Sequence, residues 1–217
     1  MPTRVKICGV TRFEDAGRAV ELGAAALGFN FYPPSPRFIE PRAARAIVQR
    51  LPPLIATVGV FANETDAGRV IALAREAGVA TLQVHGPRFP AFQELRSSFS
   101  LVVALAVRRG FDPATLAQIE ASAYLLDAFD PERLGGTGKT FDWSVAREAK
   151  RYGPIILAGG LTPANAAQAV REVRPFAVDV ASGVERAPGI KDYAKLAAFF
   201  AAVAEADKND GLGREST

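Results

Sequence analysis

Short runs of apolar residues alternate with amphipathic stretches along the whole chain. Most of these runs are almost continuously apolar, which is typical of parallel strands buried on both faces. We therefore predict strands at eight places, namely Val5–Ile7, Ala25–Phe29, Leu54–Phe61, Val79–Val84, Leu101–Val107, Tyr124–Leu126, Ile155–Ala158 and Phe176–Val180.

The stretches between the runs carry start and stop signals for helices. Thr11 has capping-box spacing to Glu14, Asn63 precedes an acidic first turn, and Thr162 precedes a proline. Gly23 and Gly78 stand where a helix can end in the left-handed conformation. We predict helices over residues 11–22, from Pro41, and over 63–78, 91–97, 113–121, 142–152, from Thr162, and from Asp192 to Ala206.

Eight strands, each followed by a helix, favour an α/β fold with a single (β/α)8 TIM barrel. At about 27 residues per unit, the length suits a strand and a helix in each. A doubly wound sheet is the alternative, but Cys8-Gly9-Val10-Thr11 is not a GxGxxG turn. We expect one catalytic domain over residues 1–206 and a polar C-terminal tail over residues 207–217.

The amino-acid composition of the chain excludes several classes of function. Lys plus Arg is 26 and Asp plus Glu is 23, which gives a net charge of +3. This small surplus does not indicate a nucleic-acid-binding protein. One Cys excludes an intramolecular disulfide, and one His excludes a multi-histidine metal site. We expect no metal and no cofactor. No apolar run could span a membrane and the first residues lack a signal-peptide core, so we expect a cytoplasmic protein without membrane or nucleic-acid partners.

Reactive groups in such barrels sit at the carboxyl ends of strands. Cys8 ends the first strand just before a helix, where the helix dipole favours a thiolate, although a lone Cys is more often a core residue. Asp127 closes an apolar strand, which raises a carboxyl pKa and suits a proton donor; a structural cap or ion pair is the alternative. Asp179 has the same ambiguity. Gln83 and His85 end the fourth strand, and we expect a structural or substrate-lining role for His85, with an acid–base role as the alternative.

Two glycine pairs follow the seventh and eighth strands. Gly159-Gly160 and Ser182-Gly183 stand where barrels of this kind commonly hold a phosphate, because glycine lets backbone amides approach an anion. The pattern predicts a phosphorylated small-molecule ligand. Arg37 lies in a proline-rich loop that stiffens the backbone, so its guanidinium suits recognition of a carboxylate. Without further information, a solvated surface arginine is the commoner case.

Several segments resemble the phosphoribosylanthranilate isomerase family in the expected order. The resemblance covers residues from about 4 to about 200. It is carried by Lys6-Ile7-Cys8-Gly9-Val10-Thr11, Ser35-Pro36-Arg37, Val58–Phe61, Leu82–Gly86, Leu125–Asp127, Gly135–Trp143, Leu157–Leu161 and Val178–Glu185.

The resemblance implies a cofactor-free Amadori rearrangement of N-(5-phosphoribosyl)anthranilate in tryptophan biosynthesis. It implies that Asp127 is the general acid and Cys8 the general base, and that Arg37 holds the anthranilate carboxylate. It further implies that Asp179 contacts the substrate, with Gly159, Gly160, Ser182 and Gly183 around its phosphate. From their place at the end of the fourth strand, we expect Gln83 and His85 to bind the substrate as well. Members of this family occur as monomers and homodimers, and both states stay open for this chain.

One position departs from the family pattern. Ala181 stands where many members carry a serine, which removes a hydroxyl near the expected phosphate but keeps the backbone amides. Two alternatives stay open. A related histidine-pathway isomerase runs the same rearrangement, but it places an aspartate where this chain has Cys8. A catalytically silent barrel that binds a phosphosugar is disfavoured by the presence of both Cys8 and Asp127.

Overall fold

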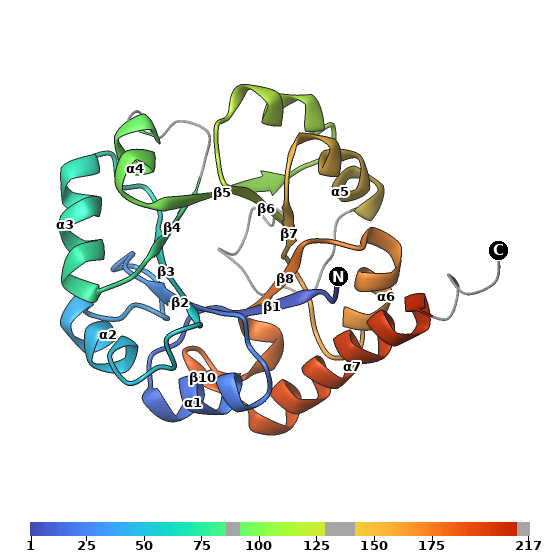
Figure 1. Ribbon diagram of the computed structural model, residues 1–217, viewed down its shortest axis with the longest axis horizontal. Coiled ribbons are helices and arrows are strands. Elements are labelled where there is room, and N and C mark those ends of the chain that lie inside the picture. The colour runs from blue at the N-terminus through green and yellow to red at the C-terminus, as the bar shows by residue number, and fades with distance from the viewer. Residues whose placement is uncertain (86–91, 129–141, 212–217) are drawn as a thin grey trace.

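The structure is a computed structural model that describes residues 1–85, 92–128 and 142–211. A closed barrel of parallel strands lies at its centre, in which each strand pairs with the next and β8 pairs with β1 (Figure 1). This confirms the predicted TIM barrel. The strands are β1 (Arg4–Ile7), β2 (Ala26–Asn30), β3 (Ala56–Phe61), β4 (Thr81–His85), β5 (Ser100–Val107), β6 (Ala123–Ala128), β7 (Ile155–Leu157) and β8 (Ala177–Val180).

Helices form a ring around the barrel (Figure 1). They are α1 (Phe13–Glu21), α2 (Pro41–Val48), α3 (Ala67–Ala77), α4 (Phe92–Ser98), α5 (Trp143–Ala149), α6 (Ala166–Val173) and α7 (Tyr193–Gly211). Three 3₁₀ turns accompany them, η1 (Pro113–Gln118), η2 (Lys150–Tyr152) and η3 (Ser182–Val184). The turn η1 replaces the α-helix expected over residues 113–121. The extra turn η3 follows β8, and a small hairpin of β9 (Glu185–Ala187) and β10 (Ile190–Lys191) comes next.

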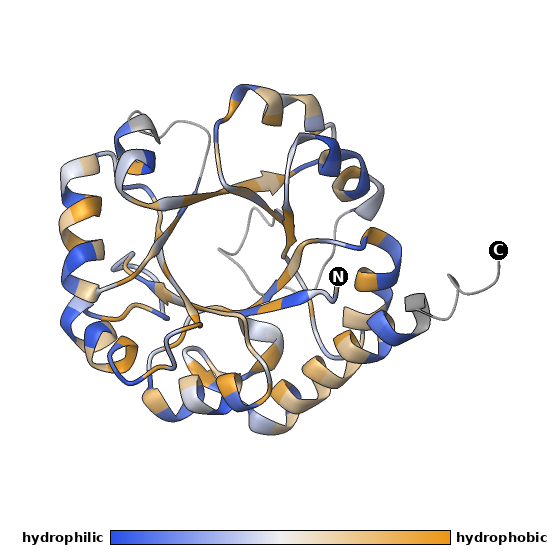
Figure 2. Ribbon diagram, in the orientation of Figure 1, coloured by the Kyte–Doolittle hydropathy of each residue, from blue (hydrophilic) through white to orange (hydrophobic). Residues whose placement is uncertain are grey.

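The strands bury both faces, as their continuous apolar runs predict. Their outer faces pack against the helices in one large apolar cluster (Figure 2). The inner faces form a separate cluster of small volume, made of Val102, Ala104, Ala123, Leu125, Ile156, Ala158 and Ala177. Because alanines dominate this inner layer, polar side chains also fit inside the ring: Lys6, Gln83 and Asp179 are all buried.

Three predicted helix starts differ from the structure. The Thr11 hydroxyl does not cap α1 but donates to the Gly189 carbonyl oxygen at 2.6 Å, because the β9–β10 hairpin packs on this loop. Asn63 does not cap α3; the carboxylate of Asp66 accepts from Arg69 N instead. The segment at Thr162 first makes a turn, in which Asn165 Oδ1 accepts from Thr162 N, so that α6 begins only at Ala166.

The last helix continues beyond Ala206 to Gly211. The expected start of a loose tail at Asp207 is therefore wrong, and residues 212–217 lie outside the described part of the chain. Asp207 holds the helix to the start of the barrel, since its carboxylate accepts from the backbone N and the hydroxyl of Thr3 at 2.7 and 2.8 Å. Within the described ranges, none of the helices has the length and apolar character needed to cross a membrane.

Candidate active site

The carboxyl ends of the strands bring Cys8, His85, Asp127 and Asp179 to one mouth of the barrel. Cys8 follows β1 and continues its ladder, because its backbone N donates to the Val180 carbonyl oxygen at 2.9 Å. Asp127 lies near the end of β6 and His85 ends β4. The pKa values of all three side chains respond to Asp179 and to Lys6, which places them around the same pair of charges.

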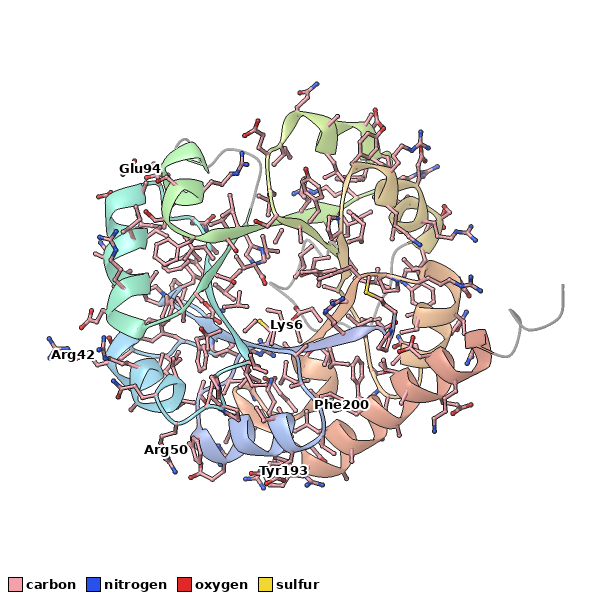
Figure 3. The ribbon with its side chains drawn as sticks, in the orientation of Figure 1. Lys6, Arg42, Arg50, Glu94, Tyr193 and Phe200 are labelled. Carbon is pink, nitrogen blue, oxygen red and sulfur yellow. The ribbon has the colours of Figure 1, made fainter. Side chains whose placement is uncertain are left out.

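A buried ion pair of Lys6 and Asp179 lies at the floor of this mouth. Lys6 Nζ is 2.7 Å from Asp179 Oδ1, and the two side chains are 4% and 10% exposed. Lys6 points to the inside of the strand ring, whereas Arg42 and Arg50 lie outside it (Figure 3). Burial opposes the charge of Lys6, but Asp179 and Cys8 raise the pKa of Lys6 above its ordinary value. Lys6 is thus a permanent ammonium, and the site analysis of the sequence missed it.

Cys8 is half-buried beside this ion pair. Its Sγ lies 2.9 Å from the point that a Cβ on Gly28 would occupy, and Lys6 Nζ lies 3.0 Å from the same point. Burial raises the pKa of the Cys8 thiol, against the lowering effect of Lys6 and Lys191. The expectation that a helix N-terminus favours the thiolate is therefore wrong. Helix α1 begins only at Phe13, and desolvation is the larger effect.

Asp127 has the environment that its place at the end of an apolar strand predicts. Burial, and secondarily the nearby Asp179 carboxylate, raise its pKa to about 6, although a hydrogen bond from the Ala128 backbone and the charge of Lys6 oppose this. The predicted upward shift is confirmed. A carboxyl group with this pKa keeps a usable fraction of its proton near neutrality, as a general acid requires.

Gln83 and His85 form a polar pair on the inner side of β4. Gln83 is buried, and its Nε2 lies 3.3 Å from His85 Nε2. Among the described residues Gln83 Oε1 has no hydrogen-bond partner. Desolvation, followed by the charge of Lys6, lowers the pKa of His85 to about 4, although the residue is exposed to solvent. His85 is therefore neutral at physiological pH, and a role in contacting substrate stays a prediction.

Arg37 is already engaged by a carboxylate of the protein. Its Nε and Nη2 donate to the Glu185 carboxylate at distances between 2.7 and 3.1 Å, and its side chain is 15% exposed. Arg37 Nη1 has no partner among the described residues, so that edge of the guanidinium can receive a second carboxylate. Gly9 makes room for this arginine, because a Cβ there would lie 2.5 Å from Arg37 Cδ.

Glu185 and Lys191 tie the hairpin after β8 to the loops that carry Cys8 and Arg37. Lys191 Nζ is 2.9 Å from Glu185 Oε1 and donates to the Cys8 carbonyl oxygen at 2.6 Å. Burial opposes the ionisation of Glu185, but Arg37 and Lys191 together lower its pKa. The sequence indicated no site role for these two residues, although Glu185 ends a segment that carries the family resemblance. Their signal is weak, since each stands in a short polar segment without periodicity.

The two glycine pairs lie on loops that touch each other. Gly159 and Gly160 both have left-handed backbones, with φ of 82° and 64°. A Cβ on Gly159 would overlap the Ala128 backbone and lie 2.7 Å from Asp127 Oδ1; one on Gly183 would overlap the Leu161 carbonyl oxygen. The structure therefore brings the glycines after β7 beside Asp127 and against the turn η3 that begins at Ser182. Phosphate binding there stays a prediction.

Two motifs of the predicted site extend outside the described residues. Gly86 and most of the segment Gly135–Trp143 are not described, and only Asp142 and Trp143 of the latter are placed. Asp142 caps α5 by accepting from Ser144 N at 2.9 Å, as predicted. The described groups suffice for acid–base chemistry: a carboxyl with raised pKa and a thiol face one mouth, above a fixed cation and beside two glycine loops.

The chain matches one family over almost its whole length. A family model described as N-(5'phosphoribosyl)anthranilate (PRA) isomerase matches residues 5–202. A curated N-(5'-phosphoribosyl)anthranilate isomerase from Citrifermentans bemidjiense is 49% identical over 199 residues, which cover 92% of this chain and 96% of the relative.

Solved structures give the same result. The phosphoribosyl anthranilate isomerase of Thermus thermophilus superposes with a TM-score of 0.85 at 40% identity, covering 94% of this chain and 99% of the other. Another, in complex with reduced 1-(o-carboxyphenylamino)-1-deoxyribulose 5-phosphate, has a TM-score of 0.83 at 36% identity, with coverage of 94% and 99%. Monomers generated from the dimeric Thermotoga maritima protein have a TM-score of 0.80 at 35% identity, with coverage of 93% and 98%.

Proposed function

The chain belongs to the N-(5'-phosphoribosyl)anthranilate isomerase family, and we propose that Asp127 and Cys8 carry its reaction as general acid and general base. The reaction is the Amadori rearrangement of N-(5-phosphoribosyl)anthranilate to 1-(2-carboxyphenylamino)-1-deoxyribulose 5-phosphate in tryptophan biosynthesis. The observation that carries the residue assignment is the placement of a proton-holding carboxyl and a thiol around one buried ion pair.

Ring opening is the step that needs an acid. Asp127 donates its proton to the ribose ring oxygen while the bond from that oxygen to C1 breaks. The lone pair of the anthranilate nitrogen forms the C=N bond, and the product is a protonated imine. A carboxyl group with a pKa raised to about 6 suits this step, because it is a stronger proton donor than water and still protonated in part near neutrality.

Proton abstraction is the step that needs a base. The Cys8 thiolate removes the proton from C2, and the electron pair of that C–H bond moves toward the cationic imine to form an enolamine. Tautomerisation of the enolamine to the ketone completes the rearrangement without any cofactor. Because burial raises the thiol pKa, the reactive thiolate is a minority species that needs a nearby positive charge.

Substrate binding uses the two ends of the site. Arg37 Nη1 and the outer edge of its guanidinium bind the anthranilate carboxylate, while Glu185 holds the other edge. Gly159, Gly160, Ser182 and Gly183 surround the phosphate with backbone amides, and the absence of a hydroxyl at Ala181 costs only one donor. Gln83, His85 and the Asp179 Oδ2 atom face the ribose and its amine from the strand ends.

The proposal also covers the domain, the cellular location and the partners of the enzyme. Residues 1–206 and the end of α7 form one catalytic domain that works in the cytoplasm on a small phosphorylated substrate, without nucleic acid, membrane or metal. The chain is a monomer or a homodimer; the dimeric Thermotoga maritima relative supports the second state.

Two conservative substitutions test the assignment. We expect Cys8→Ser and Asp127→Asn each to lower kcat by about 10²–10⁴-fold with a small change in KM, because each removes a proton-transfer group and leaves the binding contacts. The assay follows loss of the fluorescence of the anthranilate conjugate. Asp207→Asn is the control, since Asp207 binds Thr3 at the opposite end of the barrel and this variant keeps its activity within about twofold.

Near-normal turnover of either site variant refutes the role of that residue. A wild-type chain that binds the phosphosugar tightly without rearranging it would instead be a silent binding barrel.

A further inference from the structure

We propose that Lys6 is a positioning residue that promotes the thiolate form of Cys8 from beneath the substrate. This inference rests on the proposed role of Cys8 as the base. Lys6 stands two residues before Cys8, so the alternation of side chains along β1 directs both to the inside of the barrel. Lys6 lies inside the ring of strands in Figure 3.

The register of the barrel fixes Lys6 in this place. Lys6 lies directly opposite Asp179 in the pairing of β1 with β8, and the resulting ion pair is 2.7 Å long and buried. On the other side of β1, Gly28 provides the space that a side chain would otherwise fill. Lys6 Nζ and Cys8 Sγ lie 3.0 and 2.9 Å from that one point. The ammonium is therefore paired with the Asp179 carboxylate and lies on the same side of β1 as the sulfur, next to Gly28.

The ammonium has N–H groups to spare beyond the ion pair. An ammonium carries three N–H groups, and among the described residues the hydrogen bond of Lys6 Nζ goes to Asp179 Oδ1, while the charge of Lys6 acts on Cys8. Burial of an unpaired ammonium would favour loss of its proton, but the charges of Asp179 and Cys8 keep Lys6 protonated. The positive charge is thus present whenever the sulfur gives up its proton.

Other charges also face Cys8, and they do not replace Lys6. Asp179 on β8 raises the thiol pKa, whereas Lys191 on β10 lowers it less than Lys6 does. Lys191 is shared with Glu185 and with the Cys8 carbonyl oxygen.

Three more charged or titratable groups complete the surroundings. The Arg37 side chain packs against Gly9, but its guanidinium is paired with the Glu185 carboxylate. Asp127 and neutral His85 lie across the mouth, where Lys6 lowers the pKa of each. Lys6 is therefore a buried cation whose charge acts on the thiol of Cys8, the carboxyl of Asp127 and the ring of His85.

The test reads the thiol directly, without substrate. Cys8 is the single cysteine of the chain, so the rate of alkylation by iodoacetamide as a function of pH reports its thiolate alone. We expect Lys6→Met to raise the apparent pKa of alkylation by about one unit or more, and to lower kcat about tenfold or more with KM within about threefold. Asp179→Asn should shift the alkylation pKa in the opposite direction.

Two further variants separate this effect from misfolding. Lys6→Met leaves the Asp179 carboxylate buried without its partner, so the double variant Lys6→Met/Asp179→Asn removes both charges. We expect the double variant to keep the wild-type circular dichroism spectrum. Its thiol should still titrate at a higher pH than the thiol of the wild type. Lys208→Met replaces an exposed lysine in the last turn of α7 and should leave the titration unchanged.

An alkylation profile of Lys6→Met and of the double variant that coincides with the wild type would overturn the proposal. The assignment of Cys8 as the base fails separately, through retained turnover of Cys8→Ser. The alkylation result does not depend on that outcome, because it measures the effect of Lys6 on the sulfur whatever the sulfur does.

Discussion

At the scale of single residues, the site is built from pairs whose members are far apart in the sequence. Arg37 is visible in the sequence because three prolines stiffen its loop, but its partner Glu185 lies 148 residues further on. The ion pair orients the guanidinium and does not use Nη1, which suits the proposed contact to a substrate carboxylate. Orientation by a fixed partner reduces the entropy that binding must overcome.

Arg37 and Glu185 should therefore differ in how they affect substrate affinity. We expect Arg37→Ala to raise KM about tenfold to hundredfold with a smaller change in kcat, because a charge-assisted contact to the substrate carboxylate is lost. Glu185→Gln should raise KM by a smaller factor, since the arginine stays but is less fixed. Steady-state kinetics with the fluorescent substrate measure both.

A surface arginine supplies the control for that pair. Arg42→Ala breaks an exposed ion pair with Glu76 between α2 and α3 and should leave KM unchanged. An unchanged KM for Arg37→Ala would contradict the carboxylate-binding role.

The residues that the sequence analysis found and missed differ in a physical way. Cys8, Asp127 and the glycines after β7 are recognisable because each stands at the end of an apolar strand. Each is either a reactive side chain or a glycine, which differs from the apolar residues before it. Lys6 is not recognisable, because a lysine within a short run of three residues is usually a solvated side chain. Only the pairing of β1 with β8 shows that Lys6 meets Asp179 inside the barrel.

At the scale of elements, the strands were predictable, whereas three of the helix starts were not. A strand buried on both faces leaves a continuous apolar run that depends on no other segment. A helix cap depends on one hydrogen bond, and several nearby polar residues can supply it. Before α3, both Asn63 and Asp66 are suitable caps by residue type, and the acidic turn between them hides which one the backbone uses.

The cap of α3 can be tested by comparing these two residues. We expect Asp66→Ala to lower the free energy of unfolding by about 1 kcal/mol, because its carboxylate accepts from Arg69 N at the start of the helix. Asn63→Gly removes the other candidate but keeps its left-handed backbone, whose φ is 56°, and should change stability by less than about 0.5 kcal/mol.

Urea denaturation followed by circular dichroism gives both free energies. A larger loss for Asn63→Gly than for Asp66→Ala would reverse the assignment of the cap.

The hairpin after β8 shows why small elements escape prediction. β9 and β10 together have five residues and no alternating pattern of apolar positions. The hairpin is held by side chains instead: Thr11 donates to the Gly189 carbonyl oxygen, and Asp15 accepts from Lys191 N at 3.0 Å. Such contacts depend on the closed barrel, which brings the end of the chain back to α1.

At the scale of the whole molecule, closure of the barrel concentrates charge in its interior and makes stability compete with catalysis. Asp127 has a folded-state pKa of about 6 against an ordinary value of 3.8. The folded state therefore favours the protonated carboxyl. The contribution of this group to stability is fully present below pH 3.8 and is lost as the pH rises through about 6. At pH 8 the fold carries an ionised carboxylate that burial disfavours.

Asp127→Asn should consequently be more stable than the wild type at alkaline pH, even though it has lost the proton of the proposed general acid. We expect the variant to unfold with a free energy roughly 2 kcal/mol higher than the wild type at pH 8, and with only a small difference at pH 4. The difference should reach its plateau above pH 6, where the folded wild type is ionised. Urea unfolding of both proteins across this pH range measures it. A variant that is less stable than the wild type at pH 8 would mean that the carboxylate is stabilised by the mouth of the barrel, and the donor role of Asp127 would lose its physical basis.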